Sequence, residues 1–150
     1  MDYDSVEEAL YRLEVAKEHL ERAREALKVK DYPACVGFSQ LCIENAAKSV
    51  IALYRIPSWT HDPSAELREV IQEHQKEVSN RMGPPAIEKL SKLAQAAETL
   101  APEHGRVSYG DIRERKPPKA LYTEPNATGA LQLAEISVIV AEEAVEYLSS

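Results

Sequence analysis

The feature that most constrains the fold of this 150-residue chain is the spacing of its apolar residues, which recur every three or four positions. That spacing puts apolar side chains on one face of an α-helix, whereas a β-strand needs strict alternation. Residues 4–30 carry such a stripe, formed by Ala9, Leu13, Ala16, Leu20, Ala23 and Leu27. No segment of useful length alternates with the period of a strand. The sequence therefore predicts an all-α protein.

Prolines and capping residues divide the chain into five predicted helices, at residues 4–30, 33–55, 62–82, 84–101 and 126–149. Asp4 precedes Glu7 by three positions and is an expected N-cap. Asp62 followed by Pro63 reads as an N-cap and first helical residue, and Asn126 is a candidate N-cap for the last helix. Mostly short connections favour a five-helix up-and-down bundle that forms a single domain over residues 1–150.

Composition narrows the class of protein. The net charge is −7, and an acidic chain has no global attraction for polyphosphate, which argues against a generic nucleic-acid coat. No apolar run approaches the ~18 residues of a membrane span. The N-terminus is acidic and lacks the order of a signal peptide. A cytoplasmic protein without membrane contact is expected.

The two cysteines predict neither a disulfide nor a metal site. Cys35 and Cys42 fall in one predicted helix, about 10 Å apart at the usual helical rise. A disulfide needs Cα atoms within roughly 7 Å of each other, so reduced core thiols are expected. No histidine or cysteine spacing indicates zinc, and we expect no metal and no cofactor.

The predicted second helix is apolar nearly all round, which is typical of a central or covered helix. Its polar residues Gln40, Glu44 and Lys48 form one narrow line at intervals of four. We expect Lys48 to be buried and paired with Glu44 or Gln40, because an unpaired buried ammonium is costly. These three side chains either bind a ligand or only pair with one another. Surplus apolar surface on residues 33–55 and 126–149 predicts a homodimer through the second or the last helix.

Residues 104–125 differ from the rest in holding two glycines, three prolines and an excess of basic side chains. A loop of this length is usually functional or disordered. Tyr109, Arg113 and Arg115 are its candidate ligand-binding residues. The alternative is that the basic run only neutralises the acidic last helix.

Several of these residues occur together in an order that resembles the HEPN domain family. They are Asp31-Tyr32-Pro33-Ala34, Gln40, Glu44-Asn45-Ala46-Ala47-Lys48, Thr60-His61-Asp62 and the pair His104 and Tyr109. The resemblance implies a helical bundle, often dimeric. It also implies action beside a small nucleotidyltransferase of the MNT type, as its nucleotide- or substrate-binding subunit or as the toxin of a toxin–antitoxin pair. Some members are ribonucleases in which four to six residues separate an arginine from a following histidine.

That ribonuclease motif matches three times, at Arg12 with His19, Arg55 with His61, and Arg68 with His74. Only Arg55 and His61 flank a loop beside the polar line, so they are the candidate catalytic pair. Histidine suits a general base and arginine suits a phosphate contact. Pro63 stands where nuclease members often have tyrosine. The alternative to a catalytic role is that His61 braces a turn and Arg55 ends a helix.

The predicted function is therefore a non-catalytic nucleotide- or substrate-binding module. A cation for phosphate and an aromatic ring for the base are what such binding requires. The candidate residues are Gln40, Glu44, Lys48, Arg55, Trp59, His61, Asp62, Tyr109, Arg113 and Arg115. Two alternatives remain. One is a ribonuclease toxin that uses Arg55 and His61 and binds RNA, and the other is a dimeric interaction protein without a ligand.

Overall fold

The computed structural model describes residues 3–149, and every regular element in that range is helical. The all-α class is therefore confirmed. The elements are α1 (Ser5–Lys28), α2 (Tyr32–Ala52), α3 (Ser64–Glu73), α4 (Gln75–Met82), α5 (Pro85–Leu100), α6 (Glu103–Tyr109), the short 3-10 helix η1 (Pro118–Ala120) and α7 (Glu124–Leu148). Within the described range no helix has both the length and the apolar character to cross a membrane.

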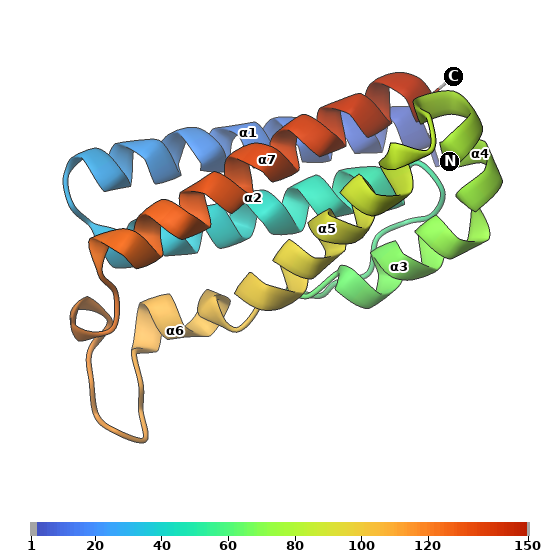
Figure 1. The fold of residues 1–150 in the computed structure, drawn as a ribbon. Coiled ribbons are helices and arrows are strands. Elements are labelled where there is room, and N and C mark those ends of the chain that lie inside the picture. Colours follow the sequence, from blue (N-terminus) through green and yellow to red (C-terminus); the bar gives the residue numbers. More distant parts are fainter. Residues whose placement is uncertain (1–2, 150) are drawn as a thin grey trace.

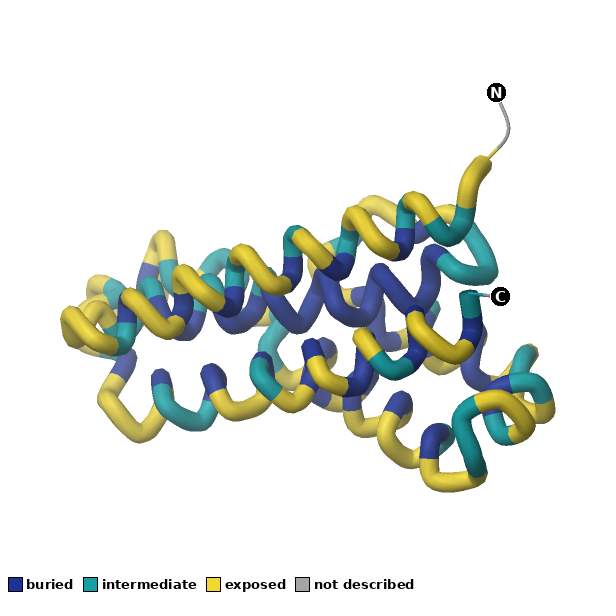
Figure 2. Tube along the Cα trace, turned by 90° about the horizontal axis from the view of Figure 1, so that it is seen from above, coloured by how far each residue is buried: buried dark blue, intermediate teal, exposed yellow. Residues whose placement is uncertain are grey.

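Helix α2 lies at the centre of the molecule. It packs lengthwise against α1 and α7, while α3, α5 and α6 lie on its other side (Figure 1). Figure 2 shows that burial is concentrated along this central helix, whose residues are nearly all buried from Cys35 to Ala52. The apolar faces of α2 are thus covered within one chain, whereas α7 keeps exposed apolar side chains such as Ile136 and Ile139.

The helix ends follow from local capping. The Asp4 side chain accepts the Glu7 backbone N–H, as expected, and Asp31 does the same for Ala34 at the start of α2. The prediction of Asn126 as the N-cap of α7 is wrong. Thr123 caps that helix and Asn126 is its reciprocal partner in a capping box, because the helix begins two residues earlier than its apolar stripe indicates.

The predicted count of five helices is too low for two reasons. The third helix is interrupted at His74, which leaves helical geometry (φ −116°, ψ 22°) where its ring stacks on Tyr54 at 3.9 Å between centroids. In addition, the stretch expected to be a loop begins with α6. Gly110 ends α6 at a φ of +72°, and an antiparallel bridge between Asp111 and Lys116 closes a small hairpin beyond it.

The connection between α2 and α3 determines where the site forms. After α2 ends, residues 53–63 turn back alongside that helix before α3 begins (Figure 1). This return brings His61 level with Glu44, two turns before the end of α2. The turn is held locally, since the Asp62 carboxylate accepts the Ser64 N–H at 3.1 Å. The predicted N-cap is nevertheless wrong by one position, because Pro63 is the N-cap of α3 and Ser64 its first residue.

Both cysteines are buried and unbridged. Each thiol faces a backbone carbonyl of α7, with Cys35 Sγ 3.6 Å from Ala127 O and Cys42 Sγ 3.8 Å from Ala134 O. Burial raises the pKa of Cys42 to about 12. The prediction of reduced core thiols is confirmed.

Candidate functional site

The polar line on α2 is buried and internally bonded. Gln40, Glu44 and Lys48 are only 2%, 6% and 5% exposed. Gln40 Nε2 donates to Glu44 Oε1 at 3.0 Å, and Lys48 Nζ donates to Glu44 Oε2 at 3.0 Å. The expectation that Lys48 is buried and paired is confirmed, and Glu44 is the hub of the line.

Glu44 is held in its charged form. Burial alone would raise its pKa, but hydrogen bonds from Gln40, Lys48 and His61 outweigh burial and lower the pKa below its ordinary value. A buried carboxylate with this many donors is a fixed negative charge at neutral pH. It neutralises the Lys48 ammonium and orients the groups around it.

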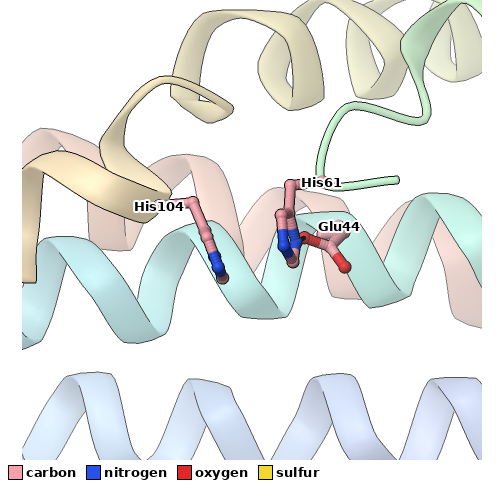
Figure 3. A group of neighbouring side chains, drawn as sticks. All are labelled: Glu44, His61 and His104. Carbon is pink, nitrogen blue, oxygen red and sulfur yellow. Dashed lines mark hydrogen bonds and ion pairs between the residues drawn. The ribbon is translucent and has the colours of Figure 1, made fainter. Parts of the chain in front are cut away.

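Two histidines from other elements complete the arrangement. His61, on the connection before α3, places Nδ1 3.1 Å from Glu44 Oε1. His104, in the first turn of α6, places Nδ1 3.1 Å from Gln40 Oε1. The two rings stack at 3.5 Å between centroids and 18° between planes. Figure 3 shows both imidazoles reaching toward α2 beside Glu44.

These five residues, Gln40, Glu44, Lys48, His61 and His104, are called the α2 cluster below. Its hydrogen-bond pattern fixes one tautomer. Because the Gln40 amide nitrogen donates to Glu44, its oxygen is left to accept from His104. His104 therefore carries a proton on Nδ1, and in the neutral ring Nε2 is left with a lone pair.

Helix α6 is anchored next to His104. The hydroxyl of Tyr122, from the segment after η1, donates to the Glu103 carboxylate, which also lies 3.6 Å from the Arg106 guanidinium. Burial and the Glu103 charge both raise the pKa of Tyr122, so this hydroxyl stays a donor. The short helix is thereby held where His104 meets α2.

A hollow of about 290 Å³ opens beside the cluster. Its lining consists of Arg12, Glu44, Lys48, Ser58, Trp59, Thr60 and His61. Trp59 is fully exposed at this hollow. The preceding Ser58 is fixed by the Glu66 carboxylate, which accepts both its N–H and its hydroxyl. The hollow therefore combines the cationic side chains of Arg12 and Lys48 with the exposed ring of Trp59.

Arg12, like His104, is absent from the candidate residues that the sequence indicates. The Arg12 guanidinium forms an ion pair with Glu8, four residues earlier on α1, at 3.1 Å. The same helix face also packs over α2, which places Arg12 in the lining with Lys48. In the sequence, Arg12 stands out only through its motif match with His19, and that motif also matches at two other places.

The remaining predicted residues lie elsewhere. The Arg55 guanidinium contacts Glu69 and Glu73 of α3, at 3.0 and 2.9 Å, whereas His61 contacts Glu44 and His104. Tyr109 is exposed at the end of α6. Arg113 and Arg115 belong to the hairpin that projects beyond α6 (Figure 1).

The other two arginine–histidine matches also serve different contacts. Arg68 pairs with Glu98 of α5 at 2.8 Å, and His74 stacks on Tyr54. His19 stacks on Phe38 at 6.1 Å between centroids, apart from the hydrogen bonds of the cluster.

Comparison with known proteins agrees with the family resemblance seen in the sequence. The family model of the HEPN domain matches residues 9–147, which includes the whole α2 cluster. The chain is also similar to a protein of Methanocaldococcus jannaschii named "Putative toxin". The two are 34% identical over 125 residues, covering 80% of this chain and 76% of the relative.

Proposed function

The chain belongs to the HEPN domain family, and from that premise we propose that it binds a nucleotide, with the phosphate at the α2 cluster and the base on Trp59. The observation that carries the proposal is the placement of a fully exposed tryptophan beside a hollow lined by Arg12, Lys48 and His61. A ring of this size is highly buried on average, so complete exposure calls for a partner.

The base contact follows from the chemistry of the ring. Every nucleobase has a π-face, and stacking on an aromatic side chain contributes about 1–3 kcal/mol per base without selecting a sequence. Trp59 stands on a connection whose backbone is fixed by the Ser58–Glu66 hydrogen bonds. Because this backbone is already ordered, binding a base to the Trp59 ring costs little further backbone conformational entropy.

The phosphate contact follows from the cations. Arg12 is a guanidinium suited to planar contacts with phosphate oxygens. Lys48 adds a second positive charge, although Glu44 offsets most of it. The His61 side chain is 60% exposed and lines the same hollow, where its ring can contact a phosphate oxygen.

Calorimetric titration with ATP, adenosine and inorganic triphosphate tests this function. ATP should bind most tightly because it supplies both the base and the phosphates. Trp59→Ala should weaken ATP binding about tenfold or more, while Trp59→Phe should restore most of it. Arg12→Ala should weaken ATP but not adenosine, and Arg68→Ala is the control on a guanidinium outside the hollow. Equal ATP affinity in the Trp59→Ala variant would refute the proposal.

The wider role we propose is that of one component of a toxin–antitoxin pair. Similarity to the archaeal protein named as a toxin supports this role, and family membership supports a small nucleotidyltransferase as the partner. Copurification from the native host should recover such a partner in stoichiometric amount. Recovery of the chain alone, under conditions that preserve other complexes, would argue for the dimeric interaction protein instead.

A second candidate function is RNA cleavage, and the His61–His104 pair is the observation that favours it. Two adjacent imidazoles from different elements could share general acid and base roles. In this candidate function His104 takes the place of Arg55 as the partner of His61, because Arg55 is held by two carboxylates. We expect no cleavage of tRNA above background. Cleavage that is lost in His61→Ala and retained in His19→Ala would establish the ribonuclease.

We also propose a homodimer through the outer face of α7. Four large apolar side chains on that helix are at least one-third exposed, and they are Leu133, Ile136, Ile139 and Tyr147. Ile136 also lines an apolar groove between α5 and α7. Light scattering should show a dimer at high micromolar concentration and a monomer for Ile136→Glu. A monomeric wild type would contradict this assembly.

A further inference from the structure

We propose that Glu44, His61 and His104 bind a single divalent transition-metal ion of the zinc class. One ligand atom from each of the three residues lies within 4.8 Å of the other two. The three come from α2, the 53–63 connection and α6, so no local spacing in the sequence announces the site. Two imidazoles and a carboxylate form a donor set that zinc favours in sites that keep an open position.

The spacing between donors suits a shared ion. Zinc lies about 2.0–2.2 Å from nitrogen and oxygen ligands, so two ligands in tetrahedral geometry are roughly 3.3 Å apart. His61 Nδ1 and Glu44 Oε1 are already 3.1 Å apart. An ion seated between them replaces the single proton that otherwise links the two atoms.

The surrounding contacts orient the ligands as metal sites require. Gln40 accepts from His104 Nδ1, which leaves Nε2 as the coordinating atom. Lys48 holds Glu44 Oε2, and Oε1, which also accepts from Gln40 Nε2, is the oxygen that faces His61. Such outer hydrogen bonds fix the tautomer of a ligating histidine and the position of a ligating carboxylate.

One movement is required. Stacked rings direct their nitrogen lone pairs along nearly parallel lines, so one ring must turn for both to converge on an ion. The His61 side chain is 60% exposed, and rotation about its Cβ–Cγ bond meets only a broad, shallow preference. Metal binding should therefore break the stack by turning His61 while His104 stays bonded to Gln40.

The charges predict moderate affinity. Lys48 already neutralises Glu44, so the site carries no net negative charge before the ion arrives. A bound ion would then attract an anionic fourth ligand, such as hydroxide or a phosphate oxygen, from the adjoining hollow. The site does not depend on nucleotide binding. A bound ion would, however, prevent His61 and His104 from acting as general acid and base, because coordination occupies the lone pairs that proton transfer uses.

The experiment measures zinc binding by calorimetry on chelator-treated protein in the absence of nucleotide. One zinc per chain is expected, with affinity at least tenfold weaker in His61→Gln and in His104→Gln. The matched control is His74→Gln, because His74 lies near Glu73 and Glu77 at 4.0 and 3.8 Å but has no second histidine. That variant should bind zinc like the wild type.

Cobalt substitution supplies a second readout. Co²⁺ should give visible absorption bands of a four-coordinate site, and these bands should vanish in His61→Gln. Circular dichroism should show that this variant folds, because the His61 side chain that it replaces is largely exposed. No zinc binding at millimolar metal, or equal binding in the wild type and both cluster variants, would overturn the proposal whatever the outcome with ATP.

Discussion

His61 and His104 stack ring on ring, and each is also hydrogen-bonded through Nδ1 to a member of the same α2 line, His61 to Glu44 and His104 to Gln40. The two contacts pin the 53–63 connection and α6 to the central helix. The candidate site is therefore also a junction of the fold, and changes in it should affect both binding and stability.

Replacing the hub carboxylate should be costly. Glu44→Gln leaves the Lys48 ammonium buried without its counter-charge, and breaking a buried ion pair in this way costs about 3–5 kcal/mol. Urea denaturation should show this loss in the free energy of unfolding. The double variant Glu44→Leu/Lys48→Met should recover at least half of it, because no buried charge remains. A loss below 1 kcal/mol in the single variant would mean that water reaches Lys48.

Stability should fall on mild acidification partly because of His19. Burial, followed by the nearby Arg22 charge, lowers the pKa of His19 below its ordinary 6.5. Its Nδ1 has no hydrogen-bond partner among residues 3–149. Below pH 6.5 the unfolded chain takes up a proton that the folded chain resists, so this contribution is full above pH 6.5 and is lost as the pH falls through the folded value.

Thermal unfolding between pH 7.5 and pH 5 measures that effect. The His19→Gln variant should lose less stability over this range than the wild type. Arg22→Gln should fall between the two, since it removes the second cause of the shift. Parallel curves for all three proteins would contradict the assignment.

The cysteines should be unreactive in the folded protein. Burial raises the pKa of Cys42 to about 12 and also raises that of Cys35, so neither offers thiolate at neutral pH. Iodoacetamide should label neither thiol in native buffer and both in strong denaturant. The labelling rate should follow the opening of α2 from α7, and rapid native labelling would show that this interface is loose.

Two glycines, Gly105 within α6 and Gly110 just after it, provide a matched pair. Gly110 has a φ of +72°, and a Cβ there would collide with the Lys116 carbonyl oxygen. Gly110→Ala should cost about 1–3 kcal/mol locally, which hydrogen exchange should register as faster exchange at the Asp111 and Lys116 amides. Gly105→Ala meets no atom within 4 Å and should leave these amides protected. Unchanged protection in Gly110→Ala would contradict the hairpin geometry.

The helices were predictable because their periodicity is local. The line of Gln40, Glu44 and Lys48 was predictable for the same reason, since one polar row on an apolar helix needs an internal partner. Helix α6 was missed because it is short, contains Gly105 and starts directly after Pro102.

The rest of the site depends on tertiary structure. The turn of residues 53–63 back along α2 decides that His61 meets Glu44 rather than Arg55. The docking of α6 decides that His104 joins it. Arg12 enters the site only through the packing of α1 on α2. None of these relations has a signature in residue spacing.

If the α2 cluster and Trp59 form the ligand site, a single titration will show it. The chain has a single tryptophan, so an ¹H–¹⁵N spectrum of the labelled protein contains one indole signal, from Trp59. On addition of ATP, that signal should shift together with the amides of Thr60, His61 and His104. Shifts confined to the 110–117 hairpin or to α7, with the Trp59 indole unmoved, would show that ATP does not bind at the α2 cluster and Trp59.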